Sequence, residues 1–145
     1  ELFQVFKNYC QQYKKQIERK FEKKLIDSIH FLKNKAKSLE DIHKNANYII
    51  TNKFSINSED FNLIDNKSKK IINDYCRKIE ESKTLNEEIL KKHLKELMDK
   101  HQTDFKGIGQ PMRIALTGSK FGPGIYNIIL SLEKDEVLKR LSRFN

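Results

Sequence analysis

The sequence predicts an all-α fold made of two small helical lobes, and three observations lead to this prediction. Apolar residues recur every three or four positions, which is helical spacing, while the alternation typical of strands is nearly absent. The 145 residues include 5 Gly and 2 Pro, so few residues interrupt the helices. Residues 51–66 are rich in Asn, Ser and Asp and offer the best lobe boundary. We therefore expect one lobe over residues 1–52 and a second over residues 53–145.

The first lobe is expected to hold a long helix and a shorter one. The long helix should run over residues 3–36 and carry an apolar stripe formed by Phe21, Leu25, Ile29, Leu32 and Ala36. Ser38 followed by Asp41 resembles a capping box in which Asp replaces the usual Glu or Gln. This pair predicts the start of a shorter helix with Ile42, Ala46 and Ile49 on one face.

The middle of the chain is expected to be a loop followed by two helices. Residues 51–66 should form the loop, with room for one helical turn. Helical spacing resumes in a segment that carries Ile72, Tyr75, Cys76 and Ile79. Thr84 and Glu87 predict a second capping box, which would start a helix carrying Leu90, Leu94, Leu97 and His101.

The last forty residues differ in character. Gly107, Gly109 and Pro111 are expected to break the chain before a short helix over residues 112–116, which Gly118 would end. Pro123 is expected in the first turn of the next helix, where its missing N–H costs nothing. That helix should bury Ile125, Ile128, Ile129 and Leu132, and a final helix should carry Val137, Leu138 and Leu141.

The charge balance favours a polyanionic partner. Lys and Arg outnumber Asp and Glu by 29 to 20, which gives a net charge of +9. Basic side chains set against phosphates release condensed counterions, so a surplus of this size is typical of nucleic-acid binding. An AT-rich coding bias also produces Lys-rich and Asn-rich chains, and it is the alternative explanation for part of the surplus.

Signatures of catalysis, metal binding and membrane insertion are missing from the sequence. The four histidines share no ligand spacing, and no nucleophile or phosphate-loop motif occurs, so we predict no catalytic residue and no metal site. Cys10 and Cys76 are expected to be free thiols. No apolar run is long enough to cross a membrane. Because the chain starts at Glu1 without an initiator Met, we expect it to be an internal fragment of a larger protein.

One stretch combines the features of an RNA-binding surface. Residues 110–118 should form a short helix and a glycine stop, and a tight loop then leads to Pro123 and Tyr126. The start of the following helix offers unpaired N–H groups to a phosphate. Arg113 supplies a planar donor fork, and Tyr126 supplies a ring on which an unstacked base can lie. A helical hairpin in which these residues only shape a turn explains the same pattern, so the residues alone leave both interpretations open.

A family resemblance favours the first interpretation. Residues 110–141 resemble the C-terminal signature of bacterial glutamyl-tRNA synthetases, which reads roughly Pro-Leu-Arg-x-Ala-Leu-Thr-Gly, a short variable loop, Pro-Gly, an aliphatic helix and a final helix ending Arg-Leu. Residues 36–42 are similar to that family's Ala-Lys-Thr-Leu-x-Glu-Leu stretch. The resemblance implies two small lobes of an anticodon-binding helical bundle. Between Tyr48 and Gln102 only the helical pattern carries over.

The resemblance also implies which residues contact the tRNA. It assigns anticodon contacts to Arg113, Gly122, Pro123, Ile125, Tyr126 and Lys35. Arg113 matches the arginine that reads anticodon bases. Lys35 stands where the family often has an arginine, and because Lys cannot make the same two-pronged contact, the choice between tRNA-Glu and tRNA-Gln stays open. The family's Leu-Gly-Lys is Leu132-Glu133-Lys134 here, so that turn is expected to differ.

The function that follows is implied by the family. This chain would select tRNA-Glu, and tRNA-Gln as an alternative, for a glutamate–tRNA ligase whose catalytic domain it lacks. It would hold no cofactor, while the parent enzyme would use ATP and Mg²⁺. We expect a cytoplasmic monomer that contacts no membrane. The rival hypothesis is a helical protein-interaction module whose basic faces are solvated.

Overall fold

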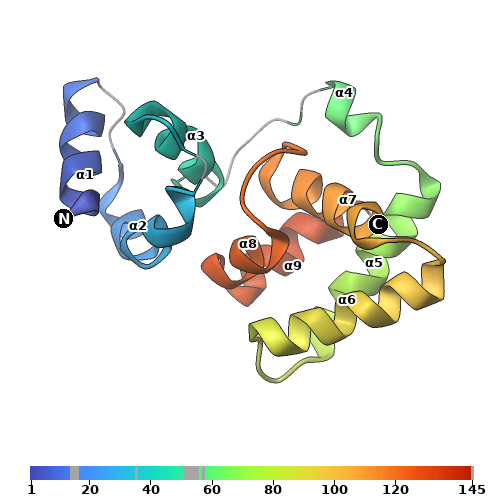
Figure 1. The fold of residues 1–145 in the computed structure, drawn as a ribbon. Coiled ribbons are helices and arrows are strands. Elements are labelled where there is room, and N and C mark those ends of the chain that lie inside the picture. Colours follow the sequence, from blue (N-terminus) through green and yellow to red (C-terminus); the bar gives the residue numbers. More distant parts are fainter. Residues whose placement is uncertain (14–16, 35, 51–55, 57, 145) are drawn as a thin grey trace. The chain divides into compact units, whose positions relative to one another are not determined.

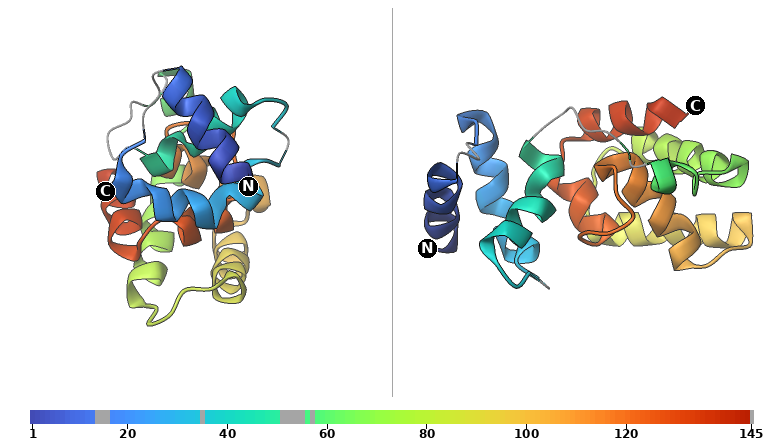
Figure 2. Two further views of the ribbon diagram at one scale, coloured as in Figure 1. Left: turned by 90° about the vertical axis from the view of Figure 1, so that its left-hand side faces the viewer. Right: turned by 90° about the horizontal axis from the view of Figure 1, so that it is seen from above.

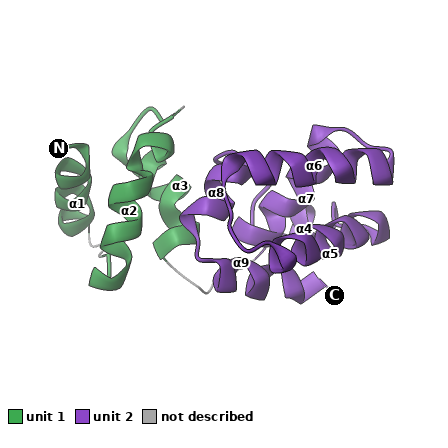
Figure 3. Cartoon of the chain, turned by 90° about the horizontal axis from the view of Figure 1, so that it is seen from below, with its two compact units in different colours: residues 1–54 green, residues 55–145 purple. Residues whose placement is uncertain are grey.

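The computed structural model describes residues 1–13, 17–34, 36–50, 56 and 58–144. Every regular element in these ranges is a helix, which confirms the all-α prediction (Figure 1). The chain divides into two compact units, Glu1–Phe54 and Ser55–Asn145 (Figure 3).

Unit 1 is a small three-helix cluster. Its helices are α1 (Leu2–Gln12), α2 (Arg19–Leu32) and α3 (Leu39–Ile50), and each packs against the other two. The buried side chains of this cluster include Phe6, Cys10, Leu25, Leu32, Ala46 and Ile49.

The single long helix expected over residues 3–36 is wrong. Tyr13 ends α1, and Glu18 is extended, with φ −63° and ψ 141°, immediately before α2. A continuous helix of that length would extend for about 50 Å and would leave the apolar face of α1 without cover. The break lets Phe6 and Cys10 become buried in the packing of α1 against α2 and α3.

The cap predicted for the third helix is confirmed. Ser38 Oγ accepts a 3.1 Å hydrogen bond from the backbone N–H of Asp41. The Asp41 carboxylate accepts a 2.9 Å bond from the backbone N–H of Lys37, one residue before the position that a capping box requires. The residues of the expected apolar face, Ile42, Ala46 and Ile49, are all buried.

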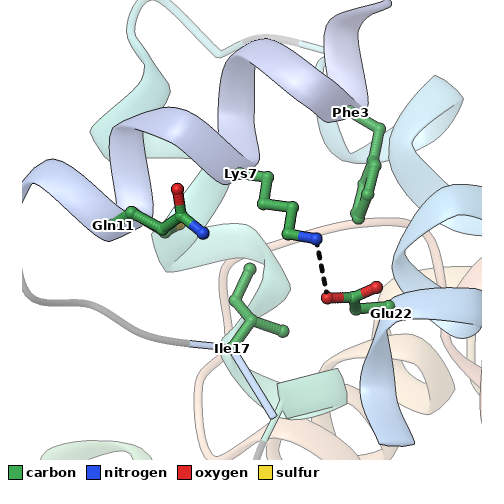
Figure 4. Close-up of a pocket in the computed structure, with 6 residues that line it drawn as sticks. Phe3, Lys7, Gln11, Ile17 and Glu22 are labelled. Atoms are coloured by element: carbon green, nitrogen blue, oxygen red, sulfur yellow. Dashed lines mark ion pairs between the residues drawn. The ribbon is translucent and has the colours of Figure 1, made fainter. Parts of the chain in front are cut away.

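A small pocket lies inside unit 1, between α1 and the chain that leads into α2 (Figure 4). The Lys7 ammonium and the Glu22 carboxylate form a 3.1 Å ion pair across it. Phe3, Cys10, Gln11 and Ile17 complete its lining. The ion pair therefore links α1 to α2 at a position where the two helices leave a gap.

Unit 2 contains the remaining helices. They are α4 (Ser58–Phe61), α5 (Asn66–Glu81), α6 (Glu87–His101), α7 (Phe105–Thr117), α8 (Ile125–Ser131) and α9 (Lys134–Leu141), followed by a 3-10 turn, Ser142–Phe144. Helix α7 contacts α5, α6, α8 and α9, and α5 also lies beside α6 and α9 (Figures 1 and 2). The core of the unit includes Tyr75, Leu90, Leu97, Ile108, Met112, Leu116, Ile128 and Leu141, all fully buried.

Helix α6 begins two residues later than the predicted capping box. Asn86, not Thr84, is the N-cap, and its Oδ1 accepts a 2.8 Å hydrogen bond from the backbone N–H of Ile89. Asn is among the strongest N-cap residues, so the helix begins after Asn86 and not after Thr84. The helical turn allowed within residues 51–66 is α4.

The expected break at Gly107, Gly109 and Pro111 is also wrong, because all three lie inside α7. Asp104 caps this helix, and its Oδ1 accepts a 2.8 Å hydrogen bond from the backbone N–H of Gly107. Gly109 and Pro111 are buried, so packing overrides the weak helix propensity of both residue types. The predicted stop at Gly118 is confirmed: this residue has φ 85°, a conformation that favours glycine.

The start of α8 differs from the prediction by two residues. Gly124 is its N-cap, so Pro123 lies before the helix and not in its first turn. The expected apolar face is confirmed, with Ile125, Ile128, Ile129 and Leu132 all buried. After α8, Lys134 Nζ donates hydrogen bonds to the carbonyl oxygens of Glu80 and Ser82, at 3.1 and 2.7 Å, which satisfies the carboxyl end of α5.

Candidate nucleic-acid interface

The connection between α7 and α8 is a tight loop, residues 118–124, with its own set of hydrogen bonds. Thr117 Oγ1 donates to the carbonyl oxygen of Arg113 at 2.8 Å and lies 3.2 Å from that of Ser119. Gly122 has φ 142°, a backbone conformation that L side chains rarely adopt. The loop therefore requires glycine at two positions, Gly118 and Gly122, and its conformation is specified locally.

Arg113 closes this loop from the α7 side. Its Nε donates to the carbonyl oxygen of Pro123 at 2.9 Å, and its Nη1 donates to that of Lys120 at 3.1 Å. The guanidinium has five N–H groups, and these two bonds involve two of them. Burial lowers the pKa of Arg113, but its ordinary value is so high that the side chain stays charged. Arg113 is therefore a half-buried cation whose remaining N–H groups can bond to a ligand.

An open groove lies beside Arg113 in the same unit. Its lining residues come from the first three turns of α7 and from the loop, and they are Phe105, Lys106, Gly109, Gln110, Arg113, Lys120 and Phe121. We call this feature the Phe105–Phe121 groove. Phe121 is 75% exposed and Phe105 is 46% exposed, so each presents an aromatic surface to solvent. Gly109 is buried beneath Phe105, whose ring would lie 3.5 Å from a Cβ at this position.

Tyr126 contacts Phe105, which is one of the residues that line this groove. The two ring centroids are 6.3 Å apart and the rings meet edge to face at 79°. Lys91 of α6 places its Nζ 5.9 Å from the centre of the Tyr126 ring. Burial, and then the carboxylate of Glu87, raise the pKa of Tyr126, so its hydroxyl stays protonated near neutral pH. Phe105 therefore contacts Tyr126 and lines the groove together with Arg113.

A distant residue also holds the loop. The carboxylate of Asp60, in α4, accepts a 3.3 Å hydrogen bond from the backbone N–H of Lys120. Asp60 is buried, with 9% of its surface exposed. Sequence reasoning missed this contact because nothing in the local spacing links residues sixty positions apart. It missed Phe105 as well, although an aromatic residue beside Lys106 is the kind of pairing found in nucleic-acid interfaces.

A buried arginine of α9 forms a hydrogen bond with the carboxyl end of α7. Arg140 of α9 is fully buried, and its Nη1 donates a 2.7 Å hydrogen bond to the carbonyl oxygen of Leu116. Its Nε donates to Oε1 of Glu136 at 3.0 Å, one turn earlier on the same helix. The last turn of α7, from which the loop departs, is therefore fixed to α9 by a charge-assisted bond.

Comparison with known families shows where this arrangement belongs. A family model described as an anticodon binding domain matches residues 1–145, the entire chain. The chain belongs to the anticodon binding domain family.

Relatives and a solved structure place this anticodon-binding domain more closely. A glutamate–tRNA ligase from Pelagibacter ubique is 50% identical over 141 residues, which cover 97% of this chain and 30% of that protein. Glutamate–tRNA ligase 1 from Bartonella tribocorum is 28% identical over 118 residues, or 81% of this chain and 25% of that protein. The chain thus spans less than a third of the length of these relatives.

A crystal structure of a glutamate tRNA ligase from Elizabethkingia meningosepticum, in complex with its amino acid, shares the fold. The TM-score is 0.76 at 15% sequence identity, and the match covers 98% of this chain and 28% of that chain. At this level of identity the likeness concerns the fold alone.

Five of the six predicted contact residues lie in unit 2 of the anticodon-binding domain. Gly122 is exposed and Pro123 is partly exposed, both on the loop. Ile125 is fully buried at the start of α8, so its side chain belongs to the core of unit 2. Arg113 and Tyr126 are half-buried. The sixth residue, Lys35, lies outside the described residues.

Two features of the described part of the chain bear on other kinds of site. No described helix is long and apolar enough to span a membrane. No group of three or more His, Cys, Asp or Glu side chains within the described ranges is arranged to hold a metal ion. Cys10 and Cys76 are thiols that form no disulfide, as the sequence predicts.

Proposed function

We propose that this domain selects tRNA for a glutamate–tRNA ligase by binding the anticodon loop on the surface formed by the groove, the loop of residues 118–124 and Tyr126. The observation that carries this proposal is the position of Arg113, whose guanidinium borders the groove and is held by two carbonyl oxygens of the loop. Membership of the anticodon-binding family and the similarity to glutamate–tRNA ligases support it.

The geometry suits unstacked bases. Single-stranded RNA loops are recognised by aromatic faces that stack on splayed bases and by fixed donors that bond to base edges. Here the donors are the remaining N–H groups of Arg113, and the aromatic face is the ring of Tyr126. Because the loop is held by Arg113 and Asp60, little conformational entropy is lost when RNA binds.

The proposal extends to the parent enzyme. It would attach glutamate to tRNA-Glu with ATP and Mg²⁺, which the rest of the enzyme would bind, and it would act as a cytoplasmic monomer. The domain would be one recognition element of a ligase about three times its length, since it covers 30% of the Pelagibacter relative. As the alternative, the parent enzyme would charge tRNA-Gln as well as tRNA-Glu. Residue 35 would be the position that decides between these two substrate ranges.

The decisive experiment compares two RNAs that differ only in the anticodon. One is a tRNA-Glu transcript, and the other is the same transcript with all three anticodon bases changed. We expect this chain to bind the first at least tenfold more tightly at fixed salt. Equal affinities would overturn anticodon recognition, and a third transcript with the tRNA-Gln anticodon would report on the substrate alternative.

A salt series completes the test. A domain that neutralises several phosphates loses affinity steeply as salt rises, with a slope of about −0.7 to −0.9 per phosphate contact on a logarithmic plot. We expect a slope of roughly −2 or steeper for the tRNA-Glu transcript. A helical module that binds other proteins would show no saturable binding to either transcript.

A further inference from the structure

Phe121 is a large apolar side chain exposed on a loop that the fold holds in place. Its ring is 75% exposed, the highest value among the large apolar residues that the structure describes as exposed. The preceding residue, Lys120, is held at both backbone groups: its carbonyl oxygen accepts from Arg113 and its N–H donates to Asp60. An exposed Phe forgoes the free energy that burial of its ring would contribute. An exposed ring carried on a backbone held in this way suits a binding platform.

The charged residues that line the groove are all basic. Lys120 Nζ lies 5.2 Å from the centre of the Phe121 ring, and Lys106 and Arg113 line the same groove. None of the described lining residues is acidic. Two carboxylates lie near the groove, and each accepts a hydrogen bond from a backbone N–H. Asp60 accepts from Lys120, and Asp104 accepts from Gly107 as the N-cap of α7. The groove therefore combines aromatic faces with positive charge.

This combination identifies the ligand class. A free phosphate would use the cations and leave the two rings in water, whereas an apolar peptide would cover the rings and bring no charge to the three cations. A nucleotide uses both, because its base stacks on an aromatic face and its phosphate pairs with Lys or Arg.

We propose that the Phe105–Phe121 groove binds one unstacked nucleotide of single-stranded RNA, with the base against Phe121 and the phosphate between Lys106 and Lys120. The inference rests on the proposed function and adds a stacking position to it. The family resemblance assigns no contact to the groove other than Arg113, and Phe121 lies in the segment where that family's signature has a short variable loop.

The test removes the ring and keeps the apolar character. Phe121→Leu is expected to weaken binding of the tRNA-Glu transcript about tenfold, since stacking on one base is worth roughly 1–3 kcal/mol. Phe121→Tyr should bind as the wild type does, because it retains the ring. The matched control is Phe61→Leu, since Phe61 is 51% exposed in the same unit and does not line the groove. It should leave affinity unchanged.

The outcomes separate this inference from the proposed function. Phe121→Leu binding like the wild type, or losing no more than Phe61→Leu, would overturn the stacking position while anticodon recognition stands. Absence of saturable binding by the wild type would overturn the proposed function itself.

A second measurement locates the nucleotide. Anticodon stem-loops that carry 2-aminopurine at each loop position in turn are titrated with the chain, because the fluorescence of this base reports its stacking. We expect one position whose signal changes with the wild type and Phe121→Tyr but not with Phe121→Leu. Identical responses of all variants at every position would contradict the proposal.

Discussion

Arg113 Nε donates a 2.9 Å hydrogen bond to the carbonyl oxygen of Pro123, so the side chain that the family resemblance assigns to base reading also closes the loop behind it. The second bond, from Nη1 to the carbonyl oxygen of Lys120, fixes the residue that precedes Phe121. The planar fork of a guanidinium can hold two carbonyl oxygens and still present three further N–H groups in the same plane, whereas an ammonium has three donors in all and no planar fork. Under the proposed function, Arg113 would both hold the shape of the loop and contact the RNA.

The first prediction follows from this dual role of Arg113. Arg113→Ala should weaken binding of the tRNA-Glu transcript by about 1–3 kcal/mol and should weaken the anticodon-changed transcript less. Arg113→Lys should recover only part of the loss, because an ammonium is a point charge without the planar fork that makes paired contacts with a base edge. Equal losses for both transcripts, measured by titration at one salt concentration, would reduce Arg113 to a loop anchor and phosphate contact.

The fold was largely predictable because helical periodicity is strong in this chain. Helical spacing predicts two buried faces, and the structure confirms both. One is formed by Ile42, Ala46 and Ile49, and the other by Ile125, Ile128 and Ile129. The break between α1 and α2 was missed because the predicted stripe began at Phe21 and said nothing about residues before it. The start of α7 was missed because local rules for Gly and Pro are overridden when packing holds the helix.

The candidate site was predictable only where its residues are close in sequence. The order of Arg113, Gly118, Pro123 and Tyr126 carries the family resemblance and brings these residues to one loop and its flanking helices. The contact of Asp60 with the Lys120 backbone spans sixty residues, so it depends on tertiary packing and leaves no local signal. The exposure of Phe121 is likewise a property of the folded chain.

The second prediction concerns the two glycines within α7. An alanine Cβ at Gly109 would meet the Phe105 ring at 3.5 Å, which is ordinary contact, so Gly109→Ala should raise the free energy of unfolding by about 0.5–1 kcal/mol through helix propensity. At Gly107 the same Cβ would lie 1.9 Å from Thr103 Oγ1. Gly107→Ala should therefore gain nothing or lose stability. Urea denaturation of both variants checks this, and equal gains would contradict the close approach of the Thr103 hydroxyl to Gly107.

The third prediction tests the support beneath the loop. Arg140→Met should lower the free energy of unfolding by about 3 kcal/mol or more, because it leaves the Glu136 carboxylate and the Leu116 carbonyl without their buried donor. The control is Arg143→Met, an exposed arginine three residues away, which should cost less than about 0.5 kcal/mol. Thermal unfolding measures both variants. If the two lose similar amounts of stability, the buried hydrogen bonds of Arg140 do not stabilise the fold more than an exposed arginine does.

The last prediction concerns the dependence of stability on pH. His93 of α6 has a buried Nδ1 with no hydrogen-bond partner among the described residues, and its ring meets Tyr75 edge to face. Burial of the ring, and then the nearby charge of Lys78, lower the pKa of His93 below its ordinary value. The folded chain therefore binds a proton less readily at this site than the unfolded chain does.

The sign of the effect follows from this difference. As pH falls below about 6.5, the unfolded state takes up a proton that folded His93 resists, so the free energy of unfolding decreases until the folded pKa is reached. Replacing His93 with Gln removes that proton uptake, so the melting temperature of His93→Gln should fall less between about pH 7.5 and 5.5 than that of the wild type. A His93→Gln slope that matches the wild type would mean that the buried ring titrates normally.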